Sequence, residues 1–517
     1  MELSEKEKKF IQEKFDSASN LPNFTLLLNV DNENSVSILS TIDSLVSQLY
    51  ENWVVHIRAN IQLDPMLAAK ISELEDRRII ISDSQPKSID DWVVEISSGT
   101  RLHPAALSAL TYLALKDPEV LVSYADHDHV DTSGVFCDPY MKPDWNQDLL
   151  NATNYFAPFV AYKKQIWEAN RNDWLDENDF LINVLKDMKN KQIAHLPFVL
   201  SSVEIDESSS HLEPVCKRIT RHLPDPKPKV SILVPTRDQG KLLERCLKTL
   251  LTVTDYAEYE IILINHESSE PKAIRVIQEY SAHNNFRVEN FSGAFNFSAI
   301  MNYAASLAEG DVLVLLNNDT EIVEPDWLTE LVSQVSRPEV GVAGPLLLFG
   351  DGTIQHAGIH PGLGGLMGHG HKHLPDGSPG YFNRLKAVHE VAAVTGACLV
   401  IKKSTWDELG GLDEKNLPVA YNDVDLCIKA RQRGLKIIFT PFSKVVHHES
   451  VSRGVDTPPK RNERLKGEIQ AMQDKWGALL YFDPAYSPNL ILDGGGFKLA
   501  PIPRVLPFWK DKITDYS

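Results

Sequence analysis

The sequence predicts an α/β protein made of two tandem domains, each built on a mostly parallel sheet. Three observations lead to this prediction. Short apolar runs alternate with amphipathic segments in both halves of the chain, which is typical of parallel strands joined by right-handed crossovers. The same order of elements occurs twice. A proline-rich stretch, 222–229, lies between the two copies and is typical of a semi-rigid linker.

Each half begins with a strand, a helix and a second strand, assigned from the spacing of apolar residues. A later run in the second half, 312–316, is apolar throughout and predicts a strand buried on both faces of a sheet. We place domain boundaries at 1–222 and 223–485, and we expect 486–517 to be a tail that wraps the surface. The opening elements are predicted at Phe24–Val30, Val36–Leu49, Trp53–Arg58, Val230–Val234, Lys241–Leu251 and Tyr259–Asn265.

Composition narrows the class of protein. A chain of 517 residues is long enough for two or three domains with their own cores. The net charge of −19 argues against non-specific binding to nucleic acid. No apolar run approaches the length of a transmembrane helix and the N-terminus has no signal-peptide core, so we expect a cytoplasmic protein, with peripheral association at the inner face of the plasma membrane left open. The five cysteines show no CxxC spacing and are expected to be reduced thiols.

The buried run 312–316 ends abruptly in the polar residues Asn317, Asn318 and Asp319. Ligands of open α/β sheets gather at the carboxyl ends of such strands. A carboxylate at that point can hold a hard divalent cation, and the cation can hold a diphosphate. Asn-Asn-Asp also forms ordinary turns, so this stretch alone does not decide between a turn and a cation-binding site.

Two further polar clusters stand at element ends downstream. Asn422 and Asp423 open an amphipathic helix, where their alternative role is to cap the first turn. About 25 residues later, His447 and His448 close a short apolar strand. Aspartates and histidines at three element ends in the same half predict a common site.

The equivalent positions of the first half lack these side chains. When the two halves are aligned with an offset of 220 around the key strand, Gly99 takes the place of Asp319. Val203 and Glu204 take the places of His447 and His448. The first half is therefore predicted to have kept the fold and lost the metal chemistry, and to serve as a scaffold or as a glycan- or partner-binding module. An active site built from other residues is the alternative.

Seven short motifs follow one another in a fixed order, at 230–237, 261–265, 317–319, 395–398, 410–413, 422–423 and 447–454. Through these motifs, residues 229 to about 455 resemble the inverting glycosyltransferases of family 2, which have a GT-A fold. Through 138–145 and 293–298, the whole chain is also similar to tandem-domain bacterial proteins of O-antigen or surface polysaccharide synthesis.

The resemblance implies a role for each cluster. Asp319 would bind Mn²⁺ or Mg²⁺ bridging the diphosphate of a nucleotide-sugar donor, and an imidazole ligand suits Mn²⁺ at least as well as Mg²⁺. One of the two histidines would complete the coordination, His448 being preferred over His447 by its spacing to Ser452. Asp423 would be the catalytic base that takes the proton of the acceptor hydroxyl.

Two positions depart from the family pattern. Asn265 stands where relatives carry an Asp that reads the base, and Asn317 replaces the first Asp of the metal-binding motif. The residues implied on the acceptor side are Gly396, Ala397, Trp406 and Asn422. The residues implied on the donor side are Pro235, Thr236, Arg237, Asn265, Glu267, Asn296, Asn302, Asn317, Asn318 and Asp319.

The function implied by the resemblance is a metal-dependent inverting transferase. It would move a hexosyl or deoxyhexosyl group from a nucleotide sugar to a polysaccharide or lipid-linked oligosaccharide in bacterial surface glycan synthesis. One alternative is a non-catalytic glycan-binding or assembly subunit with two inactive domains. Another is a nucleotidyltransferase, although 235–240 lacks the glycine-rich, basic loop that this activity needs. The histidine- and glycine-rich stretch 362–371 has the composition of a mobile lid.

Overall fold

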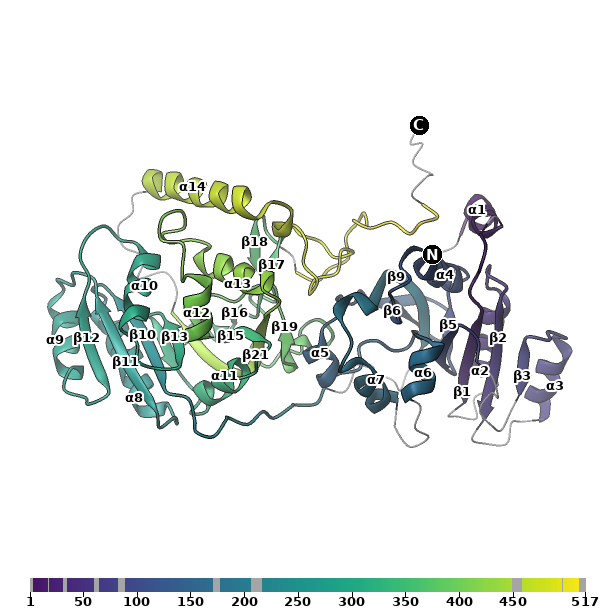
Figure 1. The fold of residues 1–517 in the computed structure, drawn as a ribbon, viewed down its shortest axis with the longest axis horizontal. Helices are drawn as coiled ribbons and strands as arrows, with labels where there is room; N and C mark the ends of the chain where they lie inside the picture. Colours follow the sequence, from purple (N-terminus) through teal and green to yellow (C-terminus); the bar gives the residue numbers. More distant parts are fainter. Residues whose placement is uncertain are drawn as a thin grey trace. The chain divides into compact units, whose positions relative to one another are not determined.

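Two units make up the chain (Figure 1), and the structure is a computed structural model. The first unit comprises Met1–Pro214, Tyr486–Leu490 and Leu499–Ser517, and the second comprises Val215–Ala485 and Ile491–Lys498. The C-terminal segment is thus divided between the units, and the predicted boundaries at 222 and 485 stay a prediction. The residues described are 3–16, 18–30, 35–59, 65–81, 89–170, 177–205, 216–448, 458–494 and 496–510.

The first unit contains one sheet with the strand order β3-β2-β1-β4-β8-β6-β9-β5, and β7 pairs with β6. Its strands are β1 (Phe24–Val30), β2 (Trp53–Ala59), β3 (Ile79–Ile81), β4 (Trp92–Ser97), β5 (Thr100–Leu102), β6 (Val122–Val130), β7 (Phe136–Tyr140), β8 (Val160–Lys163) and β9 (Ile193–Glu204). Its helices are α1 (Glu5–Phe15), α2 (Ser35–Val46), α3 (Pro65–Glu73), α4 (Ala106–Lys116), α5 (Gln147–Ala152), α6 (Lys164–Asn170), α7 (Glu177–Leu185) and the short 3₁₀ turn η1 (Asn190–Gln192).

The main sheet of the second unit has the order β12-β11-β10-β13-β20-β15-β21-β14, with β16 paired to β15 and β19 to β21. Its strands are β10 (Val230–Thr236), β11 (Tyr259–Asn265), β12 (Phe286–Asn290), β13 (Val312–Leu316), β14 (Thr320–Ile322), β15 (Val340–Leu348), β16 (Ile354–His356), β19 (His389–Glu390), β20 (Cys398–Lys402) and β21 (Lys436–His447), and a separate hairpin joins β17 (Ile359–Pro361) to β18 (Met367–His369). The helices are α8 (Gly240–Val253), α9 (Pro271–Tyr280), α10 (Phe297–Leu307), α11 (Trp327–Val335), α12 (Lys403–Leu409), α13 (Asn422–Gln432), α14 (Pro458–Trp476) and the 3₁₀ segments η2 (Tyr381–Lys386) and η3 (Gly477–Leu480).

The two sheet orders correspond strand for strand, so the predicted internal repeat and the α/β class with two mostly parallel sheets are confirmed. Each sheet also holds one antiparallel central strand, β8 or β20, which the strand–helix alternation did not predict. The register supports the sequence alignment of the halves. Thr320 pairs with His447 in the second unit, and its counterpart Thr100 pairs with Val203 in the first.

The central strands β10 and β13 of the second sheet are buried on both faces. Polar side chains of these segments are therefore found at the strand ends. All five residues of β13 are at most 2% exposed. Neighbouring β10 alternates between two cores, because Ile232 and Val234 pack into one and Leu233 into the other. Burying such side chains contributes roughly 1.5–3 kcal/mol each. Because β10 and β13 pair in parallel, with Val230 opposite Val312 and Leu233 opposite Leu315, their carboxyl ends lie together. None of the described helices is both long and apolar enough to span a bilayer.

Candidate active site

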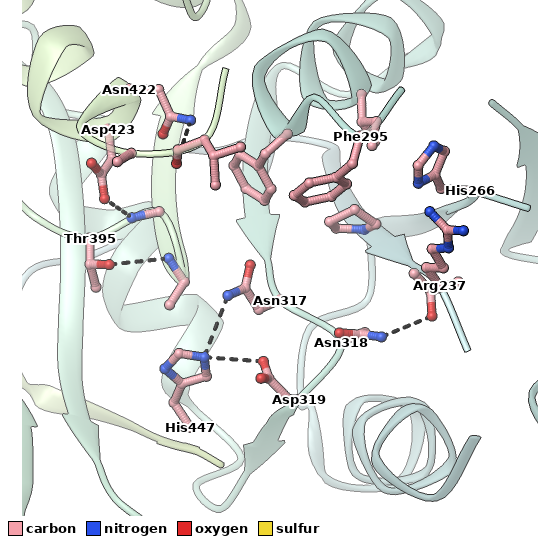
Figure 2. A pocket seen from close by; sticks show the side chains of 18 of the residues that line it. Arg237, His266, Phe295, Asn317, Asn318, Asp319, Thr395, Asn422, Asp423 and His447 are labelled. Atoms are coloured by element: carbon pink, nitrogen blue, oxygen red, sulfur yellow. Dashed lines mark hydrogen bonds and ion pairs between the residues drawn. The ribbon is translucent and has the colours of Figure 1, made fainter. Parts of the chain in front are cut away.

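A cavity of about 310 Å³ opens at the carboxyl ends of β10 and β13 (Figure 2). It brings together side chains from segments nearly 230 residues apart in the sequence. The predicted residues that line it are Pro235, Thr236, Arg237, Asn317, Asn318, Asp319, Gly396, Ala397, Asn422, Asp423 and His447.

The floor of the cavity joins the two neighbouring strand ends. Asn318 donates a hydrogen bond from Nδ2 to Oγ1 of Thr236, at 2.9 Å. The backbone N–H of Asn317 donates to the carbonyl of Ala397 at 3.0 Å. Asn318 and Thr236 are both buried, so their mutual bond satisfies polar groups that have little contact with water. The polar loop after β13 is in this way held in one conformation.

Asp319 lies beside His447 at the bottom of the cavity. Its Oδ1 is 3.1 Å from Nε2 of His447, and the Asp319 residue is 2% exposed. The strand pairing of β14 with β21 sets this contact, because it places His447 opposite the residue that follows Asp319. Nδ2 of Asn317 lies 3.4 Å from the same imidazole nitrogen.

Gln355 fixes the orientation and the tautomer of His447. Nε2 of Gln355 lies 3.3 Å from the backbone carbonyl of His447, to which it donates, so its Oε1 faces the imidazole and accepts from Nδ1 at 2.7 Å. In a neutral ring the proton therefore sits on Nδ1, and Nε2 presents its lone pair toward Asp319.

This arrangement fits a divalent cation. A carboxylate oxygen and an imidazole lone pair that point at one another are a pair of ligand atoms, and the hydrogen bond from the far ring nitrogen is the usual support of a metal-binding histidine. Among the described residues no group of three or more His, Cys, Asp or Glu side chains is placed to hold a metal ion. Asp319 and His447 would therefore need further ligands from a bound substrate or from water.

His448, the histidine preferred from the sequence, points elsewhere. Its Nε2 lies 2.8 Å from Oε2 of Glu321 and 3.0 Å from Nη1 of Arg245. The alternation of side chains along a strand explains this, because neighbours such as His447 and His448 face opposite sides. In the structure His447, and not the preferred His448, lies beside Asp319, so the geometry favours His447 as the metal ligand. Residues 449–457, which include the rest of the histidine motif, lie outside the described part of the chain.

Asp423 stands at the first turn of α13, at the end of the cavity away from Arg237 (Figure 2). Its Oδ2 accepts from the backbone N–H of Gly396 at 2.8 Å, and its Oδ1 from that of Val424 at 2.8 Å. Burial raises the pKa of Asp423, although these N–H groups act in the opposite direction. Part of the side chain remains open to the cavity. A carboxylate with a raised pKa and access to a ligand is suited to take up a proton.

The side chain of Asn422, next to Asp423, holds neighbouring segments together. Its Nδ2 donates to Oγ of Ser298 at 3.0 Å and to the carbonyl of Val419 at 3.2 Å. Asp425, two residues after the proposed base, is fully buried and binds Lys475 at 2.7 Å. These contacts fix the start of α13 and hence the position of Asp423.

Besides His448, five predicted residues do not line the cavity. Asn265 donates to Asn290 at 2.9 Å and accepts from the N–H of Ser268, so both ends of its amide are engaged at the strand end. The other four hold loops or belong to the core. Glu267 accepts from the N–H of Gly293, Asn296 caps α10, Asn302 bonds both the N–H and the carbonyl of Leu412, and Trp406 is 4% exposed in the core.

The sequence did not single out several residues that line the cavity. His266, directly after Asn265, is 1% exposed and bonds the carbonyl of Gly293 through Nε2 at 2.9 Å. The stretch 362–371, whose composition is that of a mobile lid, holds the turn and the second strand of the β17–β18 hairpin, and His369 of that strand lines the cavity. Pairing of distant segments decides these positions, which no local pattern reveals. The further lining residues are Phe295, Phe297, Ile300, Gln355, Lys372, Thr395, Val419, Ala420, Arg464 and Leu465.

Comparison with known proteins gives one family match within the second unit. Residues 231–380 match the sequence model of glycosyl transferase family 2. The second unit is therefore similar to this family over the strands that form the cavity floor and over Asp319. The matched region includes Asp319, whereas Asp423 and His447 lie beyond it.

The relatives extend the likeness over both units. The chain is 31% identical over 535 residues to the uncharacterized protein y4gI of Sinorhizobium fredii, an alignment that covers 93% of this chain and 59% of that protein. It is 29% identical over 535 residues to the O-antigen biosynthesis protein RfbC of Myxococcus xanthus, covering 93% of this chain and 41% of RfbC. The N-acetylglucosaminyl-diphospho-decaprenol L-rhamnosyltransferase of Mycobacterium tuberculosis is 24% identical over 244 residues, which is 44% of this chain and 78% of that enzyme. The chain thus spans between two fifths and three fifths of the length of the first two relatives.

Proposed function

We propose that the second unit is a metal-dependent inverting glycosyltransferase. It would transfer a sugar from a nucleotide-sugar donor to a polysaccharide or lipid-linked oligosaccharide acceptor in bacterial surface glycan synthesis. The main support is one cavity that Asp319, His447 and Asp423 share although they come from three distant segments. The roles named for RfbC and for the mycobacterial rhamnosyltransferase support the glycan substrate class.

The donor would lie at the end of the cavity that Thr236, Arg237 and Asn318 line, next to Asp319. The guanidinium of Arg237 at this end suits a phosphate of the donor. Asp319 and His447 would hold Mn²⁺ or Mg²⁺, and the cation, when bound, supplies positive charge that neutralises the departing nucleotide diphosphate. The two side chains are already in contact at 3.1 Å, so they are preorganised for this role.

Asp423 would act as the base. The carboxylate takes the proton of the acceptor hydroxyl as that oxygen attacks the anomeric carbon of the donor sugar, and the bond from that carbon to the diphosphate breaks. A positioned base of this kind contributes about 10²–10⁴-fold to a rate. Attack on the face opposite the leaving group gives inversion, as the family resemblance implies.

The first unit would be non-catalytic in this scheme. Gly99 and Val203 occupy the positions of Asp319 and His447 in the same sheet register, and neither supplies a ligand atom. We propose that this unit binds glycan or a partner and that the protein works on the cytoplasmic side of the membrane.

Ligand-dependent thermal stability tests the proposed metal and donor together. A ligand that binds only the folded state raises the melting temperature. We expect one nucleotide sugar from a panel of UDP-, GDP- and dTDP-sugars to stabilise the protein with Mn²⁺ and not with chelator. Asp319→Ala should abolish the shift, whereas Asp407→Ala, at a largely exposed helix position, should retain it. Equal stabilisation in chelator would contradict the assigned role of Asp319.

Release of nucleoside diphosphate separates the transferase from a non-catalytic glycan-binding subunit. The wild type should release it from the stabilising donor, and Asp423→Asn should bind the donor without comparable release. A protein that binds donor yet never releases diphosphate would favour the non-catalytic alternative.

A further inference from the structure

Helix α14 (Pro458–Trp476), labelled in Figure 1, lies beyond residues 231–380, which the family model matches. It packs onto the second unit through Met472, which is fully buried in one of the two cores of this unit. Two buried carboxylates also join the helix to the unit, Glu468 on α14 itself and Asp425 on α13. Both carboxylates lie at segments next to the proposed base, Asp423.

Glu468 holds the loop that precedes α13. Its side chain is 1% exposed, and Oε1 accepts from the backbone N–H groups of Val419 at 2.7 Å and Ala420 at 2.8 Å. Hydrogen bonds to an ionised acceptor are shorter and stronger than neutral ones, so this oxygen fixes both peptide groups. Nε of Arg464 lies 3.5 Å from the other carboxylate oxygen and compensates the charge of Glu468.

Asp425 ties the first turn of α13 to the far end of α14. Nζ of Lys475 lies 2.7 Å from Oδ1 of Asp425, and Nε1 of Trp476 donates to the same oxygen at 2.9 Å. The Asp425 residue is fully buried, and a buried charge is costly unless its partners are in place. The contact therefore holds the helix and the turn in one arrangement.

The two ties lie on either side of Asp423 in the sequence. Glu468 holds 419–420 before it, and the end of α14 holds Asp425 after it. The carboxylate of Asp423 is aimed by the N–H of Gly396, at 2.8 Å, which comes from a segment 27 residues away. This bond forms only where α13 begins at the right place, and α14 holds the chain on both sides of that place.

We propose that α14 sets the position of Asp423, with Glu468 as the positioning residue. This inference rests on the proposed transferase function, in which Asp423 takes the proton of the acceptor hydroxyl, and it adds the residue that places this base. Glu468 is not among the residues that line the cavity, so it would act through the loop and not on the substrate. A displacement of about 1 Å at a reacting group can cost roughly 10²-fold in rate, so a buried residue outside the cavity can affect transfer.

Hydrogen exchange at the Gly396 amide, followed by NMR, tests the position of Asp423 without requiring activity. This N–H is donated to Oδ2 of Asp423, so its exchange rate reports whether the carboxylate is in place. Glu468→Met removes the acceptor for the two loop N–H groups and keeps a side chain of similar volume. We expect Gly396 to exchange at least about tenfold faster in this variant, as for loss of a hydrogen bond to a charged group. Asp423→Ala gives the reference rate for the amide without its acceptor.

Release of nucleoside diphosphate, with Mn²⁺ and the stabilising nucleotide sugar, tests the effect on the chemistry. Glu468→Met should slow release by about 10–100-fold. Its affinity for the donor should stay that of the wild type, because the donor would lie at the Arg237 end of the cavity, opposite Asp423 (Figure 2). Glu468→Gln keeps an acceptor oxygen for the two N–H groups and should recover most of the rate.

The matched control is Glu330→Met. It removes a carboxylate of α11 whose side chain is 10% exposed and which accepts from Thr440 at 2.8 Å and from Gln334 at 3.0 Å. Glu330 does not line the cavity. The control should lower thermal stability and leave both the exchange of Gly396 and the release of diphosphate unchanged.

Wild-type exchange of Gly396 in a folded Glu468→Met protein would overturn the proposal, as would equal changes in the control. Unchanged release by this variant, measured against an active wild type, would also overturn it. If Glu468→Met proves unfolded, Trp476→Phe replaces it with the same expected directions, because it removes one donor to Asp425 and keeps the ring packing. If the wild type releases no diphosphate from any donor, the transferase function fails, and the exchange of Gly396 still decides whether α14 positions Asp423.

Discussion

Replacing Gln355 with methionine tests the link between a buried amide and the proposed metal ligand. Methionine has a similar volume, so the change removes two hydrogen bonds to His447 and leaves the packing nearly filled. These bonds, at 2.7 Å to Nδ1 and 3.3 Å from the backbone carbonyl, fix the ring and its proton. Without them the imidazole can rotate or place its proton on Nε2, which faces Asp319.

The expected effect follows from the support that a ligand receives from its neighbours. Loss of such a hydrogen bond typically weakens metal affinity about 10–100-fold, which is roughly 1.4–2.7 kcal/mol. We expect a weakening in this range for Mn²⁺, measured from the electron paramagnetic resonance of the free ion with a saturating nucleoside diphosphate. Gln355→Glu keeps an acceptor for Nδ1 and should retain the affinity.

The matched control is Gln334→Met, which removes a fully buried glutamine with two hydrogen bonds away from the cavity. It should lower thermal stability to a similar degree and leave Mn²⁺ affinity unchanged. Wild-type affinity in a folded Gln355→Met protein would refute the reasoning, as would equal losses in both variants.

Two further predictions concern buried ionisable groups. Burial raises the pKa of Asp423, so ionisation of this carboxyl costs stability; the wild type should lose stability relative to Asp423→Asn as the pH rises through the carboxyl range, while transfer by the variant slows about 10²–10⁴-fold, and a stability difference that does not change with pH would contradict this account. In the first unit, burial alone would lower the pKa of His195, but Asp126 at 2.8 Å and Asp144 at 3.1 Å outweigh it and raise the pKa to about 9. Because this value lies above the ordinary 6.5, the pairing contributes about 3 kcal/mol below pH 6.5 and loses it as the pH rises through about 9. The stabilities of wild type and His195→Gln should therefore converge in alkali, and an NMR titration of the His195 ring with a midpoint below 7 would disprove the assignment.

The sequence predicted best what short-range patterns determine. Val312–Leu316 and Tyr259–Asn265 are strands with the predicted bounds, because an apolar run that ends in polar residues indicates where the strand stops. The internal repeat could be predicted because the same order of apolar runs and amphipathic segments occurs in both halves. The choice between His447 and His448 was missed because it depends on which face of β21 meets β14, and that register is set by a pairing across about 130 residues.

Gln355 and Arg464 show a second limit. Neither belongs to a recognisable motif, and each reaches the cavity through a partner far along the chain, His447 for Gln355 and the 419–420 loop, through Glu468, for Arg464. The sequence can indicate the residues that carry chemistry, because carboxylates and imidazoles at strand ends are conspicuous. The residues that orient them are ordinary in composition and become evident from contacts.

The two units share a fold but differ in the side chains at the candidate site. Both sheets have the same strand order, and Thr100 pairs with Val203 as Thr320 pairs with His447. The strand pairing that would bring a carboxylate and an imidazole together is thus present twice, while the side chains are present once. A glycine at position 99 has a φ of 84°, a conformation that favours glycine over aspartate, so the first unit departs in backbone preference as well as in side chains. Restoring Asp and His at 99 and 203 would therefore not by itself rebuild the site, and the contact between Asp319 and His447 in the second unit depends on the loop conformation at Asp319 as much as on the sheet.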